Sequence, residues 1–545
     1  MLGAIAQAAA LSTVFWFLWK YCKQVFLKSP LDNIPGPARD SFLYGNLKQI
    51  LHRHAWPVYD ALTETYPGVL RLAGPLGHRI LYVFDPVAMH SVIVKDQYVF
   101  EESRFFIKTS EVTLGPGLLA TLGEHHRKQR KLLNPVFSIA HMRHMLPTFY
   151  DVSHKLQQGI EGRVAGRNGP VEVDILSWMG RVALELIGQS GLGYSFDPLV
   201  ADSADELGLA VKRFQPLMMQ LNIIRRILPY LPDVGSPWLR RKIVEMVPNK
   251  NVQELKKNVD LMHERAVAIC EEKKRLLAQG DEAFKDKVGE GKDLMSILLR
   301  ANMAASDEDK LPDEEIVGQV ATFIVAAMDT TSNALSMTFS LLAEHPEVQD
   351  KLRKEIMEAS SGGLEDIDYD TLTSLPYLDA VCRETLRMHP PITSVFRETR
   401  KDAVLPLSQP ITGVDGSQVS EILVPKDTTV IVGIYSSNRN KAIWGEDALE
   451  WKPERWLNGL PDTVSDAKIP GVYSNLMTFL GGGRACIGFK FSQLEMKVVL
   501  CLMLLKFKFE PSGKQIKWNL AGIRFPSVGD SMKPSLPLKL SMYKK

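Results

Sequence analysis

The segment Phe479-Leu-Gly-Gly482-Gly-Arg484-Ala-Cys486-Ile-Gly488 decides how this chain is interpreted. From average composition, its Phe, Gly, Arg, Cys and Gly at these spacings arise by chance on the order of 10⁻⁴ times per chain of this length. The apolar stretch from Phe489 to Leu505 predicts a helix that starts just after Cys486. A thiolate is stabilised at a helix N-terminus, where backbone N–H groups point at the sulfur. We therefore expect Cys486 to serve as a thiolate.

The residues around Cys486 suit a haem. A thiolate ligand pushes electron density toward the iron and favours cleavage of the O–O bond. Arg484 suits pairing with a propionate, and Phe479 suits packing beside the sulfur. Gly482 and Gly488 would let the backbone turn tightly and approach the porphyrin. The alternative is a buried structural cysteine in a glycine-rich loop.

This segment resembles the haem-binding loop of the cytochrome P-450 superfamily, and the likeness extends along nearly the whole chain. The resemblance implies haem b (iron protoporphyrin IX) with Cys486 as the axial ligand of the iron. It places Arg484, Phe479 and Gly488 among the cofactor-binding residues. It also implies a monooxygenase of the eukaryotic microsomal type, and the residue pattern resembles fungal enzymes of secondary metabolism.

The motif Ala326-Ala327-Met328-Asp329-Thr330-Thr331 lies midway along an apolar stretch, residues 314–342, which predicts a helix through the core. A carboxylate beside a hydroxyl is costly there unless it is paired or used. A threonine hydroxyl can bond to the carbonyl four residues earlier and distort the helix, which makes room for oxygen and water. The match to the family's oxygen-activation motif implies that Thr330 stabilises activated oxygen and that Asp329 relays protons. The alternatives are a helix cap or a satisfied core pair. Ala327 stands where the family usually has glycine, so a narrower oxygen groove is expected.

Glu384-Thr-Leu-Arg387 places opposite charges at i and i+3 on one helix face. Alone, such a pair is usually a solvated one on the surface. Here Met388-His-Pro-Pro391 follows and Pro453-Glu-Arg455-Trp456 lies downstream, which resembles the family's Glu-Arg-Arg triad. The resemblance implies that Glu384, Arg387 and Arg455 brace the haem loop, with no catalytic role.

The segment from Gly123 to Phe137 resembles the family's propionate-binding helix, which implies Arg130 as a propionate partner. His126 stands where the family often has tryptophan, and both ring types offer an N–H donor. Vicinal histidines also suggest a metal site, but His125 and His126 point to different helix faces. Arg397, after the Pro390-Pro391 turn, is implied as a third cationic contact.

The rest of the pattern predicts a mainly α chain with a small β portion, in keeping with the cytochrome P-450 fold. Two β-rich runs between Val69 and Phe84 predict a hairpin. Residues 124 to about 304 are mostly helical in pattern, with interruptions near Gly191, Pro229 and Pro248. Further expected elements are helices at His345–Glu358 and Tyr377–Met388 and a strand at Thr428–Ile434.

A single N-terminal transmembrane helix is expected to precede this fold. Leu2 to Trp19 are 18 residues without a charge, which as a helix span about 27 Å, the thickness of a thin endoplasmic reticulum bilayer. Lys20, Lys23 and Lys28 follow, so the positive-inside rule places the rest of the chain in the cytoplasm. A cleaved signal peptide is the alternative, but the basic n-region is absent. The expected organisation is a transmembrane anchor at 1–20, a basic and proline-rich linker at 21–40, and a haem-thiolate monooxygenase domain at 41–545.

Composition excludes several other classes. The net charge of +2 gives no reason to expect a nucleic-acid partner. The five cysteines form no CxxC pair, so a zinc ribbon or a thioredoxin-type motif is unsupported. Cys270, Cys382 and Cys501 are expected to be small buried apolar residues. The catalytic domain is expected to be monomeric.

The segments that line the substrate pocket in the family are apolar here, which predicts a lipophilic small-molecule substrate. A terpenoid is favoured and an aromatic compound is the second choice. Core packing is the simpler explanation of each residue taken alone. The segments contain Phe100, Phe105, Phe106, Leu118, Phe214, Leu217, Met218, Met219, Ile223, Phe323, Ile392, Val395 and Phe525.

After Leu505 only 40 residues remain, too few for a flavin domain. The resemblance implies that electrons come from a separate membrane-bound, NADPH-dependent flavoprotein reductase, so NADPH is used only indirectly. A basic docking face for it is expected from Arg127, Lys128, Lys131, Lys490 and Lys497, although such charges are often simply solvated.

Three functions remain to be weighed. The first is a monooxygenase that uses O2 and inserts one oxygen atom into a C–H bond. The second is a haem-thiolate enzyme that rearranges hydroperoxides; Asp329 and Thr330 argue against it, because that chemistry needs no proton relay. The third is a haem sensor or carrier, which the apolar pocket segments and the relay residues disfavour.

Overall fold

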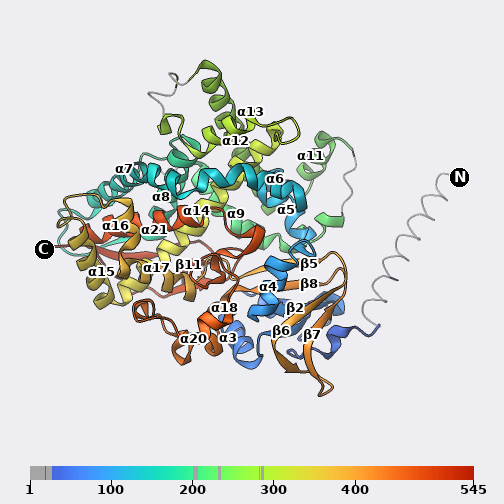
Figure 1. Ribbon diagram of the computed structural model, residues 1–545. Coiled ribbons are helices and arrows are strands. Elements are labelled where there is room, and N and C mark those ends of the chain that lie inside the picture. Colours follow the sequence, from blue (N-terminus) through green and yellow to red (C-terminus); the bar gives the residue numbers. More distant parts are fainter. Residues whose placement is uncertain are drawn as a thin grey trace.

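The computed structural model describes residue 19 and residues 27–199, 206–230, 235–280, 283 and 288–544. Most of the expected anchor, and Cys22, lie outside these residues. Within them, no helix is both long enough and apolar enough to cross a membrane. The described chain is mainly helical with a smaller β portion, as the sequence predicts (Figure 1).

A long buried helix, α14 (Asp313–Glu344), runs through the helical part, where the sequence predicts one at residues 314–342 (Figure 1). Asp313, Glu314 and Glu315 occupy its first turn, where negative charge interacts favourably with the helix dipole. Helices on several sides pack against it. They are α8 (Ile175–Leu186), α12 (Lys250–Gln279), α15 (Pro346–Ala359), α17 (Pro376–Met388) and α21 (Phe489–Lys506).

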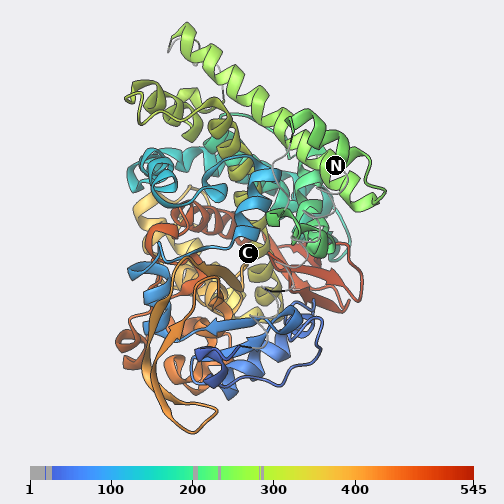
Figure 2. The same ribbon diagram turned by 90° about the vertical axis from the view of Figure 1, so that its right-hand side faces the viewer.

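The largest sheet, with its blue and orange strands, lies at the bottom of the molecule in Figure 2, and α12, in green, lies along the top. The largest sheet has the strand order β1-β2-β8-β5-β3. Its first two strands form the predicted hairpin, with Val69 opposite Val83. In the β3–β5 pairing, Glu102 lies opposite Arg397. The bounds are β1 Val69–Ala73, β2 Arg79–Val83, β3 Phe100–Glu102, β5 Ser394–Thr399 and β8 Thr429–Gly433.

Smaller sheets complete the β portion. β6 and β7 form a long antiparallel hairpin, β10 and β11 form a short one, and β4, β12 and β9 form a three-stranded sheet. Strand β4 interrupts the stretch that the sequence predicts to be mostly helical, because it pairs with a strand near the C-terminus. The bounds are β4 Val171–Asp174, β6 Ala403–Thr412, β7 Gln418–Val424, β9 Phe507–Pro511, β10 Ile516–Asn519, β11 Phe525–Val528 and β12 Pro537–Met542.

The remaining helices surround this frame. Those that concern the site are α3 (Trp56–Thr65), α5 (Arg104–Leu114), α6 (Gly123–Leu133), α7 (Ile139–Val164), α9 (Glu206–Gln220) and α18 (Ile434–Arg439). The others are α2 (Leu47–Ile50), α4 (Pro86–His90), α10 (Asn222–Arg225), α11 (Pro237–Glu245), α13 (Leu294–Ala304), α16 (Tyr369–Ser374), α19 (Lys441–Trp444) and α20 (Asp462–Ala467).

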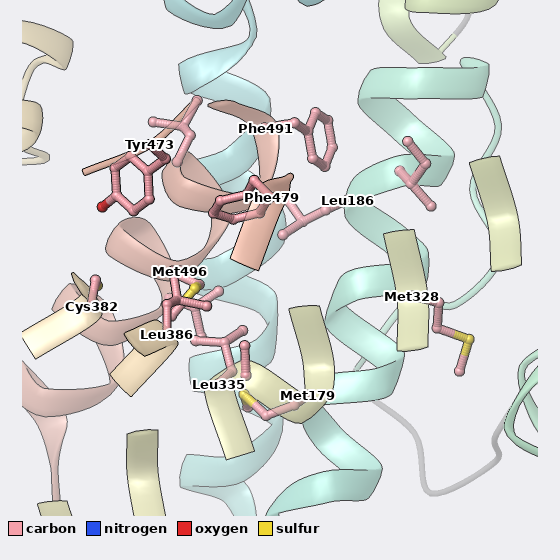
Figure 3. Packing of buried hydrophobic residues seen from close by; sticks show 14 of the residues in the cluster. Met179, Leu186, Met328, Leu335, Cys382, Leu386, Tyr473, Phe479, Phe491 and Met496 are labelled. Carbon is pink, nitrogen blue, oxygen red and sulfur yellow. The ribbon is translucent and has the colours of Figure 1, made fainter. Parts of the chain in front are cut away.

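One large apolar core joins these helices. Phe479, at the start of the Cys486 loop, and Met496 of α21 belong to this core. Leu335 of α14 and Met179 of α8 belong to the same cluster (Figure 3). The rings of Phe149 on α7 and Phe491 on α21 meet edge to face at 4.8 Å. Cys270, Cys382 and Cys501 are buried, as the sequence predicts.

Candidate functional site

The loop that carries Cys486 is held by its own backbone. The N–H of Cys486 donates to the carbonyl of Phe479 at 2.8 Å, and α21 begins three residues later, at Phe489. Phe479 is buried and packs against Tyr473 and Phe489. Cys486 itself is exposed although its neighbour Ala485 is buried, so the sulfur borders open space.

Two groups stabilise the thiolate form of Cys486. Although Cys486 is accessible on one side, the protein atoms packed around the sulfur desolvate it and raise the pKa of the thiol, whereas a hydrogen bond from the backbone N–H of Gly488 and the positive charge of Arg130 lower it. The N-terminal turn of α21 thus contributes to the sulfur the kind of donor that the sequence predicts. A bound metal ion would go further, because a coordinating thiol is deprotonated outright.

The glycines of this loop have different roles. Gly482 has a φ of +63°, and a Cβ there would lie 2.2 Å from the carbonyl oxygen of Ile93, so only glycine fits. The N–H of Gly483 donates to the side chain of Gln97 at 2.8 Å. Residues 487 and 488 form the expected turn, but Gly488 has a φ of −88° and a ψ of 11°, which other residues also adopt. The contribution of Gly488 is the N–H that bonds the sulfur.

The Ala326–Thr331 motif borders open space within an otherwise buried helix. Ala326 is exposed, whereas Val325 and Met328 are buried. The Thr330 hydroxyl donates to the carbonyl of Ala326 at 2.7 Å, which is the bond expected from the sequence, and α14 stays helical through Ala327. The Thr331 hydroxyl lies 3.2 Å from that of Ser492 on α21. The motif is therefore adjacent to the first turn of the helix that follows Cys486.

Asp329 on α14 lies near a lysine that the sequence analysis did not select. Burial raises the pKa of Asp329 to about 7, while Lys212 and a hydrogen bond from Asn333 act to lower it. Burial lowers the pKa of Lys212 on α9 to about 8, opposed by Asp174 and Asp329. A cavity of about 10 Å³ is lined by both residues and by Asn333, which is room for about one water molecule.

Four of the predicted cofactor-binding side chains form one basic cluster. His126 and Arg130 come from α6, Arg397 from β5 and Arg484 from the Cys486 loop. His126, Arg130 and Arg484 line a cavity of about 1060 Å³ between α6 and the loop. Burial, together with the positive charges of Arg484 and Arg130, lowers the pKa of His126 to about 3, so its ring is neutral with one N–H to donate. Arg130 also donates to the carbonyl of Ala485.

Two arginines of this cluster share a carboxylate. Arg397 lies 3.1 Å from Oε1 of Glu102, and Arg484 lies 3.0 Å from Oε2. Arg484 also donates to the carbonyl of Thr121 at 2.6 Å. Glu102 is absent from the sequence predictions, because nothing near it in the chain indicates its partners, which are about three hundred and four hundred residues away.

These groups fit a haem. One sulfur borders open space at a helix N-terminus, as an axial ligand must. Nearby, the three guanidinium groups of Arg130, Arg397 and Arg484 and the neutral His126 ring supply donors for two carboxylates. Because these elements come from distant parts of the chain, their convergence depends on the tertiary fold.

The predicted Glu-Arg-Arg residues meet in a fully buried network. Arg387 donates twice to the carboxylate of Glu384, at 2.8 Å to each oxygen, and Arg455 lies 3.4 Å from the same carboxylate. Trp456 and the backbone of Lys452 donate to it as well, both at 3.0 Å. Every oxygen of this buried carboxylate is thereby satisfied.

A short chain of hydrogen bonds links that network to the Cys486 loop. Arg387 donates to the carbonyl of Asn438 at 2.9 Å. The Asn438 side chain accepts from the N–H of Met477 and donates to Thr478. Met477 and Thr478 belong to the turn that ends at Phe479 (Met477–Phe479). The network therefore fixes the entrance to the loop.

The expected basic docking face is only partly formed. Arg127 and Lys131 are about three-quarters exposed and line the large cavity beside the loop. Lys497 does not belong to it, because its side chain is buried and paired with Asp379 at 2.8 Å. Lys128 donates to the carbonyls of Glu308 and Lys310.

The apolar residues expected at the substrate pocket are divided between core and surface. Phe214, Leu217 and Met218 of α9 are buried, and Phe525 lines the small cavity with Asp329. Phe106 is exposed, and Phe105 lies under the guanidinium of Arg225 at 4.9 Å. Phe323 packs edge to face against Phe137 at 5.8 Å.

Comparison with known proteins agrees with these observations. The family model described as Cytochrome P450 matches residues 35–534. Among similar proteins, cytochrome P450 monooxygenase 91 of the fungus Postia placenta is 55% identical over 97% of each chain. Cytochrome P450 monooxygenase 219 of the same organism is 52% identical over 97% of each chain. Ganoderic acid synthetase of Ganoderma lucidum is 46% identical over 99% of this chain and 98% of its own.

Proposed function

The chain belongs to the cytochrome P450 family and is a monooxygenase with fungal relatives, and from this premise we propose that it oxidises a lipophilic, terpenoid-like small molecule with O2. The observation that supports this most directly is the position of Cys486, whose sulfur borders open space and receives the Gly488 N–H. The terpenoid preference is supported by the name of the relative ganoderic acid synthetase and by the apolar side chains of α9.

We assign the roles of the site residues on this basis. Haem b, bound through Cys486, would supply the iron at which O2 is reduced and its O–O bond is split. Arg130, Arg397 and Arg484 would orient and neutralise the two propionates, and the neutral His126 ring would donate a hydrogen bond to one of them. Glu384, Arg387 and Arg455 hold the loop through Asn438. Phe479 limits access of water to the sulfur from the buried side.

Protons are supplied from α14. Thr330 presents a hydroxyl that is fixed by its bond to Ala326. Asp329, with a pKa raised to about 7, can both release and accept a proton near neutral pH. Lys212 and Asp329 both line the small cavity, which has room for about one water molecule to take part in this proton transfer.

The location and the electron donor are part of the same proposal. The 18 uncharged residues followed by Lys20, Lys23 and Lys28 support a single-pass anchor in the endoplasmic reticulum, with the catalytic domain in the cytoplasm. An NADPH-dependent flavoprotein reductase would deliver electrons, and the exposed Arg127 and Lys131 beside the Cys486 loop support docking there.

The proposed function can be tested with the full chain and a reductase in membranes. We expect NADPH-dependent conversion of a terpenoid in a mixed panel of terpenoids and aromatic compounds, with one atom of ¹⁸O2 in the product. Product from aromatic compounds alone would overturn the terpenoid assignment. Turnover of a lipid hydroperoxide without NADPH or reductase would instead indicate an enzyme that rearranges hydroperoxides. Binding of a gas to the haem, without turnover of a terpenoid, an aromatic compound or a hydroperoxide, would indicate a sensor.

Replacing Thr330 by alanine is expected to reduce product formed per NADPH consumed by about tenfold or more, because a positioned proton-transfer group is lost. The measurement is product and hydrogen peroxide at matched NADPH consumption. Thr338→Ala is the matched control, because the Thr338 hydroxyl makes the same bond to a carbonyl four residues earlier, at 2.9 Å, elsewhere on α14. Equal coupling in both variants would contradict the role of Thr330.

The pH dependence of product formation is expected to show an inflection near 7 that belongs to Asp329. Lys212→Met removes a cation that lowers the pKa of Asp329, so the inflection should move to higher pH, by up to about one unit. Lys212→Arg keeps the charge and should leave the profile in place. The measurement is product formed per NADPH consumed, followed from pH 6 to 9. Identical pH profiles for Lys212→Met and the wild type would refute the electrostatic coupling between Lys212 and Asp329.

A further inference from the structure

Glu102 is a buried acid in the basic cluster, with 7% of its surface exposed. Its two carboxylate oxygens are divided between Arg397 at 3.1 Å and Arg484 at 3.0 Å. Because Glu102 lies opposite Arg397 in the β3–β5 register, the sheet itself sets the first of these contacts. The second ties the sheet to the Cys486 loop.

The neighbouring acids have other partners. Successive strand residues point to opposite faces, and Glu101 accordingly pairs with Arg400 at 3.2 Å. Glu398, next to Arg397 on β5, pairs with Arg104 and Arg400 at 3.4 and 3.3 Å. Of these three acids, only Glu102 contacts the predicted cofactor arginines.

The charges of the cluster are unbalanced without a ligand. Arg130, Arg397 and Arg484 are three cations, His126 is neutral and Glu102 is one anion, which leaves two positive charges. Like-charge repulsion is already visible, since burial lowers the pKa of Arg484 and the charges of Arg397 and Arg130 lower it further. Glu102 raises this pKa, and Glu101, which pairs with Arg400, raises it less. Two positive charges match the two propionates of a haem.

We propose that Glu102 is a positioning residue of the cofactor site, which holds Arg397 and Arg484 in place and adjusts the charge of the cluster to that of two propionates. The proposal rests on the haem-binding function proposed above. It assigns two separable effects to one carboxylate. The negative charge of Glu102 would lower the reduction potential of the bound haem iron. The length of the Glu102 side chain determines the positions of the two guanidinium groups.

The charge is tested by Glu102→Gln, which keeps the shape and removes the negative charge. The equilibrium constant for one-electron reduction should rise on the order of tenfold, or about 59 mV in midpoint potential. Glu398→Gln is the matched control, because it removes an acid from the adjacent strand that pairs with Arg104 and Arg400 instead. The potential of the control should stay at the wild-type value.

The position is tested by Glu102→Asp, which keeps the charge and shortens the side chain. We expect a potential close to wild type but transfer of haem to an acceptor apoprotein about tenfold faster, since charge-assisted bonds to the arginines are lost. A carbon monoxide difference spectrum of the reduced wild type and of each variant separates failure of the proposed haem function from failure of the role proposed for Glu102. If the wild-type protein lacks the thiolate band, the proposed haem function is wrong. If the band is present and both variants match the wild type in reduction potential and in the rate of haem transfer, Glu102 only stabilises the local fold and the proposal is overturned.

Discussion

Cys486→Ser is expected to abolish the red-shifted Soret band that reduced, thiolate-ligated haem gives with carbon monoxide. Product formation should fall to the background of a reductase-only sample. The reason is chemical, since a serine hydroxyl cannot provide the electron-rich sulfur that favours O–O cleavage. The difference spectrum of the reduced protein and the yield of oxidised substrate measure the two effects.

The other cysteines provide the control for this prediction. Cys270 is buried on α12, away from the loop, so Cys270→Ser should keep the band and the product. Far-UV circular dichroism separates loss of the ligand from loss of the fold. Cys486→Ser protein that is folded and still shows the full thiolate band would refute the ligand assignment.

Glu384→Gln is expected to cause the largest loss of stability, about 3–5 kcal/mol. The substituted amide would have nearly the shape of the native carboxylate, but Arg387 would lose the carboxylate that pairs with it. Arg455 would keep only its ion pair with Asp447, at 2.7 Å. Both are buried at this network, with Arg387 completely inaccessible. Unfolding of a chain this long is generally irreversible, so the half-life at elevated temperature and the yield of haem-loaded protein are the appropriate measurements.

A surface pair with the same spacing is the control for this prediction. Glu124 and Arg127 are also three residues apart, at 3.5 Å, but both side chains are more than 70% exposed. Glu124→Gln should change stability by no more than about 0.5 kcal/mol. Equal losses of stability in Glu384→Gln and Glu124→Gln would show that burial does not increase the contribution of the Glu384 network to stability.

The local features of the site were predictable from the sequence. The loop before Cys486, the helix that follows it and the Thr330 bond to Ala326 depend on residues within a few positions of one another. The helix at residues 314–342 was also predictable, because apolar residues dominate this long stretch. The packing of Glu384 and Arg387 against Arg455 followed from resemblance, since a pair at i and i+3 does not by itself distinguish core from surface.

Burial of individual charged residues was not predictable. Lys497 was expected on an exposed basic face, yet it is buried against Asp379. Glu495, two residues earlier on α21, is completely inaccessible with no hydrogen-bond partner among the described residues, and burial raises its pKa. α21 is covered on several sides, so the usual rule that charged residues face water fails there.

The sequence by itself identified the groups on which the proposed chemistry depends, because the cysteine, the helix that follows it and the threonine of α14 are specified by short patterns. Only the tertiary structure decided the electrostatics around them. Glu102 meets Arg397 through the register of two strands and Arg484 through the docking of a loop onto that sheet. Lys212 meets Asp329 across two helices. The strength and sign of such pairings depend on distance and burial, and these quantities exist only once distant parts of the chain have packed together.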